Sequence, residues 1–194
     1  MSAAFVLKTG VPIGAALAVE HFVLRHKFPL AYQISNVFSE LPKAYGAVII
    51  VNVILSSFLM IFLGIKVGKA RTFFKEKAAK DGDKDAEARF SYPKMYAEGF
   101  SEEAKLFNCV QRGHQHALET YTQFIVLSIV GGVKFPLVSS AAGFLWMYAR
   151  IKWAEGYKTG EPSKRYQNWV AYGIWSSLIV LASSSIVTAV VIVL

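Results

Sequence analysis

Residues 166–194 read YQNWVAYGIWSSLIVLASSSIVTAVVIVL and carry no charged side chain. Residues 44–65 are likewise uncharged. A helix needs about 20 apolar residues to cross the hydrocarbon core of a bilayer, and both runs are long enough. The final uncharged stretch is longer than that of a typical buried helix in a small soluble domain. Because 54% of the whole chain is also hydrophobic, we predict an all-α integral membrane protein.

Two further segments are apolar over most of their length and carry charges near one end. We therefore predict a four-helix membrane bundle in a domain that covers residues 41–194, with spans at about 44–70, 107–133, 136–157 and 167–193. Gly131 and Gly132 are predicted to end the second helix and Pro136 to open the third.

The remaining segments are predicted to lie outside the bundle. Residues 1–40 form an N-terminal extension, either a signal or transit segment or a disordered stretch. Residues 74–105 are rich in Lys, Asp, Glu and Ala, which predicts a solvated loop without a single conformation. We assign no site to that loop.

The formal net charge of +8 is concentrated in two places. Basic residues gather between the first and second predicted spans and again between the third and fourth, whereas only Lys134 lies between the second and third. Positive residues collect in cytoplasmic loops, so this pattern places both basic loops in the cytosol. The charge therefore reports topology and not a nucleic-acid surface. A single cysteine, Cys109, excludes an internal disulfide and a cysteine metal cluster.

One stripe of polar residues lies where the second predicted span meets the cytosol. Arg112, His116, Glu119 and Gln123 follow one another at steps of four, three and four residues, so a helix presents them on one face. Ionisable groups in a membrane segment are costly unless they face a partner or a wet cavity. The stripe is therefore predicted to face a binding site.

Other polar and basic residues are expected at the same cytosolic end of the bundle. Arginine binds carboxylates through paired hydrogen bonds, and a glutamate can hold an ammonium group, so the cluster favours a small zwitterion with more than one carboxylate. A cation beside a bound thiol would also lower the pKa of that thiol. The residues that join the stripe there are Arg71, His114, Arg150, Tyr157, Lys164 and Arg165.

Simpler interpretations remain open from spacing alone. Arg112 and Glu119 can form a structural ion pair, and Trp153 and Tyr157 can be interface aromatics. His114 and His116 are two residues apart on a helix and point to different faces, which argues against a zinc site. We expect no metal.

Two motifs resemble a known family. FNCVQRGHQ at 107–115, followed by Leu118, Glu119 and Tyr121, and GYKTGEPSKR at 156–165 closely resemble the MAPEG family, and within it the type 3 microsomal glutathione S-transferases. KAYG at 43–46 and KAR at 69–71 resemble the family's first helix.

The resemblance implies a homotrimer in membrane lipid that binds glutathione between subunits. It implies an enzyme, a glutathione transferase and glutathione-dependent peroxidase, acting on lipophilic electrophiles and lipid hydroperoxides, with leukotriene-C synthase activity in some members. The implied location is the endoplasmic reticulum membrane, with the nuclear envelope or an organelle outer membrane as alternatives. By position, Arg71, Arg112, Glu119 and Tyr157 match glutathione-binding residues, and Arg165 matches the arginine that stabilises the thiolate.

The sequence departs from the family pattern at two of these positions. His116 stands where the family usually has asparagine, and Trp153 stands where it usually has tyrosine. The loop after Tyr157 is one residue longer than in some relatives, so Lys164 competes with Arg165 for the catalytic role. These departures keep a second function open, a non-catalytic scaffold that binds or presents lipid. A transporter is disfavoured because the charges sit at one end of the bundle.

Overall fold

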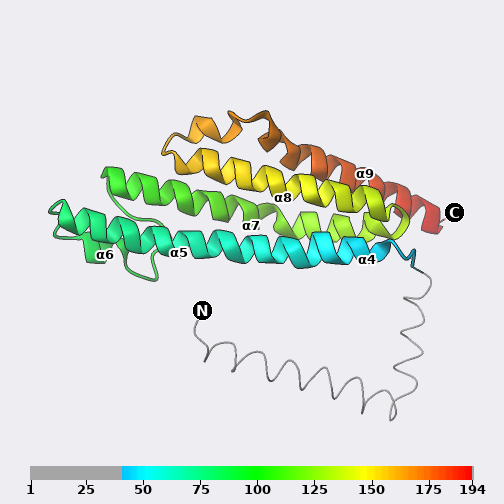
Figure 1. The fold of residues 1–194 in the computed structure, drawn as a ribbon, viewed down its shortest axis with the longest axis horizontal. Coiled ribbons are helices and arrows are strands. Elements are labelled where there is room, and N and C mark those ends of the chain that lie inside the picture. Colours follow the sequence, from blue (N-terminus) through cyan, green and yellow to red (C-terminus); the bar gives the residue numbers. More distant parts are fainter. Residues whose placement is uncertain (1–40, 194) are drawn as a thin grey trace, which may run out of the picture. The chain divides into compact units, whose positions relative to one another are not determined.

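The computed structural model describes residues 41–193, and these residues form helices and turns without a strand among them. The prediction of an all-α protein is thus confirmed for this part of the chain. A compact unit begins at Lys43, and the predicted N-terminal extension lies outside the described residues. Four long helical segments pack alongside one another (Figure 1). They are α4–η3–α5 (Tyr45–Lys80), α7 (Glu102–Lys134), α8 (Pro136–Lys158) and α9 (Gly173–Val193).

The first segment is a continuous helix in three parts. It comprises α4 (Tyr45–Val48), the π-helix η3 (Ile49–Leu55) and α5 (Ser56–Lys80). This segment, and the stretch Trp169–Val193 that contains η5 (Trp169–Tyr172) and α9, are long and apolar enough to cross a membrane. The two predicted outer spans are therefore present as helices. Four membrane crossings stay a prediction, because α7 and α8 carry more charge.

The core between the helices is aromatic at its centre. Phe124 of α7 stacks on Trp146 of α8 with ring centroids 4.1 Å apart, and both side chains are fully buried. Gly131 and Gly132 do not end α7, contrary to the sequence prediction, since the helix continues to Lys134. They let α9 and α4 approach closely instead, because a Cβ on Gly131 would lie 2.9 Å from the Cβ of Ser184. Pro136 opens α8 as predicted.

The segment between the first two long helices is ordered, so the prediction of a loop without a single conformation is wrong. Helix α5 runs on to Lys80, α6 covers Ala86–Phe90, and residues 67–107 enclose a second hydrophobic cluster that we call the headpiece. Phe90 and Phe107 meet edge to face at its centre, 5.7 Å apart. Burying an aromatic side chain of this size contributes roughly 1.5–3 kcal/mol to stability. The prediction of a disordered loop rested on its polar composition and did not include this contribution.

Local signals explain where α7 begins. The Ser101 hydroxyl accepts a hydrogen bond from the Ala104 backbone N–H at 3.1 Å, and Glu102 and Glu103 occupy the first turn. An N-cap serine satisfies a free helix N–H group, and acidic residues complement the positive end of the helix dipole. Helix α7 therefore starts in the headpiece and carries the polar stripe toward the apolar core.

Candidate functional site

An ion pair on α7 forms one wall of the site. The Arg112 Nη1 atom lies 2.5 Å from Glu119 Oε1, and both side chains stay partly exposed. The two residues are two helical turns apart, so they share a face. The simpler interpretation from the sequence, an ion pair, describes the observed geometry. Exposed ion pairs contribute only about 0–1 kcal/mol, so a ligand that supplies both a carboxylate and an ammonium group can replace the pair at small cost.

An aromatic stack connects α7 to α8. The rings of His116 and Trp153 lie nearly parallel with centroids 4.3 Å apart, and Trp153 packs on Tyr157 at 4.6 Å. The edge of Trp175 from α9 meets His116 at 6.3 Å. The two residues at which the sequence departs from the family pattern are therefore in direct contact. Sequence spacing could not show this, because the contact depends on how α7 packs against α8.

Arg150 lies behind this stack and is 1% exposed. Its Nη1 atom donates to His116 Nδ1 at 2.6 Å, and its Nη2 atom donates to the Thr120 hydroxyl. A guanidinium group has no acceptor atom, so the Nδ1 atom of His116 must accept. The proton of the neutral ring then lies on Nε2, which makes His116 a hydrogen-bond donor like the amide of asparagine. Arg150 enters no ion pair with a carboxylate among residues 41–193.

Arg165 is held against Tyr157 by the turn that follows α8. Helix α8 ends at Lys158, Gly160 takes a φ of 82°, and Pro162 opens the short helix η4 (Pro162–Tyr166). Glycine and proline thus separate α8 from the short helix that follows. The Arg165 Nη1 atom donates to the Pro162 carbonyl at 2.7 Å, and its guanidinium lies 5.7 Å from the Tyr157 ring centroid.

Lys164 points to a different part of the surface. Its Nζ atom pairs with Glu161 Oε1 at 2.9 Å, and it borders a separate groove together with Lys152 and Gln167. Of the two basic residues that compete for the catalytic role, Arg165 is the one that contacts Tyr157.

Arg112 and Tyr157 line an open groove of about 460 Å³. Its other wall comes from the headpiece loop, which sequence reasoning left without a site. Asn108 holds this loop by two hydrogen bonds to the backbone of Ala97, at 2.8 and 2.9 Å. The signal in the sequence was the aromatic content of the loop, although its contact with α7 is not visible there. The remaining lining residues are Tyr96, Gly99, Phe100, Lys105, Asn108 and Cys109.

Comparison with protein families agrees with this geometry. The MAPEG family model matches residues 49–187, which is most of the chain. The chain belongs to the MAPEG family. MAPEG proteins use glutathione as a substrate, and the family includes glutathione transferases, peroxidases and leukotriene-C synthase. Family membership together with the two apolar helices identifies an integral membrane protein.

Arg71 and His114, which the sequence predicts to lie at the site, are located away from the His116–Trp153–Tyr157 stack. The Arg71 guanidinium is buried in the headpiece, where it donates to the carbonyls of Phe90 at 3.0 Å and Lys94 at 2.7 Å. His114 faces α5, and its ring lies 3.6 Å from the position a Cβ would take on Gly64. His114 and His116 thus point to different faces, as the sequence predicts. Glutathione binding by Arg71 and His114 stays a prediction.

Proposed function

We propose that this MAPEG protein is a membrane-bound glutathione transferase and glutathione-dependent peroxidase that resembles the type 3 microsomal glutathione S-transferases. One observation carries the proposal. Arg112, which pairs with Glu119, lines one groove with Tyr157, and Tyr157 in turn contacts Arg165 and the His116–Trp153 stack.

Glutathione has two carboxylates, one ammonium group and a thiol, and this surface offers a partner for each. The Arg112 guanidinium binds a carboxylate through paired hydrogen bonds, and Glu119 then accepts from the ammonium group. His116 donates from Nε2 to a carbonyl or carboxylate of the tripeptide, which replaces the hydrogen bond of the family's usual asparagine. Arg150 fixes the ring for this task.

The thiol of the bound tripeptide is placed beside Arg165 and the Tyr157 hydroxyl. A nearby guanidinium favours the charged form and lowers the pKa of the thiol, so the thiol loses its proton to solvent near neutral pH. The thiolate attacks an electrophilic carbon of a lipophilic substrate and forms a thioether, while the bond from that carbon to its leaving group or epoxide oxygen breaks and that atom takes the electron pair. With a lipid hydroperoxide it attacks the terminal oxygen, so the lipid leaves as an alcohol. A second glutathione then reduces the oxidised sulfur, giving glutathione disulfide and water.

The wider setting is part of the same proposal. Four spans, a homotrimer with glutathione bound between subunits, and residence in the endoplasmic reticulum membrane follow from the resemblance. The exposed apolar side chains along α5, α8 and α9, which include Phe58, Phe144 and Ile186, support contact with lipid or with neighbouring subunits.

The test measures the turnover rate of the protein reconstituted in proteoliposomes, once with a lipophilic electrophile and once with a lipid hydroperoxide. The variants Arg165→Ala and Lys164→Ala are compared with the wild type. We expect Arg165→Ala to lower kcat by about 10²–10³, the usual cost of removing one group that stabilises a reacting anion, with little change in the KM for glutathione. Lys164→Ala is the matched control and should stay near wild type. A raised KM with unchanged kcat in Arg165→Ala would show that the residue only binds substrate.

A second function has support from the same stack. The rings of His116 and Trp153 stack on each other, so the stacked face of each ring is not free to contact a ligand. Such a site would suit a scaffold that presents lipid without reacting with it. Calorimetric titration with glutathione separates the two functions. Binding of glutathione favours the enzyme, and lipid binding without glutathione binding favours the scaffold.

A further inference from the structure

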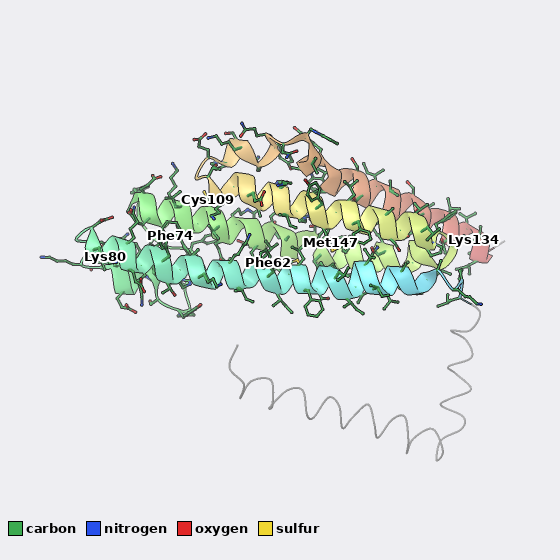
Figure 2. The ribbon with its side chains drawn as sticks, in the orientation of Figure 1. Phe62, Phe74, Lys80, Cys109, Lys134 and Met147 are labelled. Carbon is green, nitrogen blue, oxygen red and sulfur yellow. The ribbon has the colours of Figure 1, made fainter. Side chains whose placement is uncertain are left out.

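One stripe of α5 changes from apolar to basic along its length. Phe58, Phe62, Lys66, Lys69 and Phe73 follow at steps of four, four, three and four residues, so they share one helix face. The three phenylalanines are 63%, 47% and 60% exposed. Figure 2 labels Phe62 on this stripe and the neighbouring Phe74. The stripe therefore joins a surface suited to acyl chains to a cluster of ammonium groups.

The two lysines of the stripe border a groove of about 400 Å³ between α5, α7 and the end of α8. Lys158, the last residue of α8, supplies a third ammonium group on its rim. This lysine groove shares no lining residue with the groove beside Arg112 and Tyr157. Its floor is apolar and is formed by Ala70, Phe73, Phe74 and Val110.

Among residues 41–193, no carboxylate pairs with a lysine of this groove. Lys66, Lys69 and Lys158 take part in no ion pair within residues 41–193, and the Lys66 ammonium lies 4.4 Å from the Phe62 ring centroid. Glu155 lies close to the groove, in a small adjoining cavity that also contacts Lys66 and Lys158, but its carboxylate pairs with Lys152 at 2.9 Å. Six lysines near the groove or in the headpiece and η4 do have carboxylate partners, namely Lys75, Lys77, Lys94, Lys105, Lys152 and Lys164. Lys80 and Lys84 have none among residues 41–193, but they do not line the groove.

The lysine groove lies where the exposed apolar face of α5 ends, which corresponds to the headgroup region of a membrane that this helix would cross. Exposed apolar residues cover α5 up to Ile65, and the lysines begin at the next residue. Basic pockets between membrane helices on the cytoplasmic side bind anionic headgroups, and each lysine near the surface contributes about 1 kcal/mol. A phosphomonoester carries roughly 1.5–2 negative charges, which suits three ammonium groups better than a single carboxylate does.

We propose that the lysine groove binds the phosphomonoester headgroup of an anionic membrane lipid, with its acyl chains along Phe58 and Phe62. This site is separate from the proposed glutathione site and does not depend on it. Lipid bound there bridges α5 and the end of α8, the helix that carries Tyr157 and leads into η4.

The test uses the full chain in nanodiscs of phosphatidylcholine, titrated with short-chain phosphatidic acid and followed by native mass spectrometry. The groove variant is Lys66→Gln/Lys158→Gln. Its matched control is Lys80→Gln/Lys84→Gln, which removes the same charge from the exposed end of α5 and the turn after it. We expect wild type and the control to bind alike, and the groove variant to bind about ten- to thirtyfold more weakly. Lys66→Arg/Lys158→Arg keeps the charge and should retain binding, which separates lost charge from misfolding.

Three outcomes would overturn the proposal. Equal losses in the groove variant and the control would show general attraction to a basic surface. Unchanged binding in the groove variant would place the lipid elsewhere. Binding of a short-chain fatty acid as tightly as phosphatidic acid would show a carboxylate site in place of a phosphate site.

Discussion

Gly156→Ala should impair catalysis by displacing Arg165. A Cβ at this position of α8 would press on the Lys164 carbonyl oxygen and lie 2.8 Å from Arg165 Cα. Two non-bonded carbon atoms are normally at least about 3.5 Å apart, so the backbone that carries Arg165 must move by about 0.7 Å. Overpacking of this kind costs about 1–3 kcal/mol, and the better helix propensity of alanine offsets about 0.5–1 kcal/mol of it. Misplacing a reacting group by about 1 Å lowers the rate by about 10².

The assay is kcat for glutathione conjugation in nanodiscs, with thermal unfolding measured on the same samples. Gly68→Ala is the control, because a Cβ on Gly68 meets no atom within 4 Å. That variant should keep full turnover and gain about 0.5–1 kcal/mol of stability. If Gly156→Ala turns over as fast as Gly68→Ala while both remain folded, close packing of η4 against α8 does not position Arg165.

Three further predictions concern the headpiece and the core. Asn108→Ala should speed hydrogen exchange in the loop that it holds, and protection unchanged from wild type would argue against that clamp. The Arg89 guanidinium lowers the pKa of Asp83, so the pair stabilises the folded headpiece above the ordinary Asp pKa of about 3.9. This contribution is lost as pH falls through the lowered pKa. Limited proteolysis of the wild-type headpiece should therefore become faster in acid, whereas the Asp83→Asn variant should not show this pH dependence. Gly143→Ala should cost about 1–3 kcal/mol in thermal unfolding, because the new methyl would overlap the buried amide of Asn52; an unchanged melting temperature would contradict this.

Helix ends were predictable wherever a residue constrains its own backbone. Pro136 opens α8 and Gly160 follows its end with a positive φ, and both were visible in the sequence. Gly131 and Gly132 are also glycines near a helix end, but they do not end the helix. Their lack of a side chain instead allows close contacts with α9 and α4. Composition alone does not separate a helix-ending glycine from a packing glycine.

The candidate site divides in the same way. The Arg112–Glu119 pair follows from helical spacing, because both residues lie on α7. The buried position of Arg150 and its hydrogen bond to His116 depend on the packing of α8 against α7, which no local pattern encodes. The headpiece was missed for the same reason, since its order depends on long-range bonds such as those from Arg71 to the carbonyls of Phe90 and Lys94.

The most direct test of the proposed function is ultraviolet absorbance of detergent-purified protein on mixing with glutathione near neutral pH. We expect a thiolate band with the wild-type protein and no band with Arg165→Ala, although that variant still binds glutathione. A band that persists in Arg165→Ala would remove Arg165 from its proposed role. Glutathione binding by the wild type without any thiolate band would contradict the enzyme proposal itself.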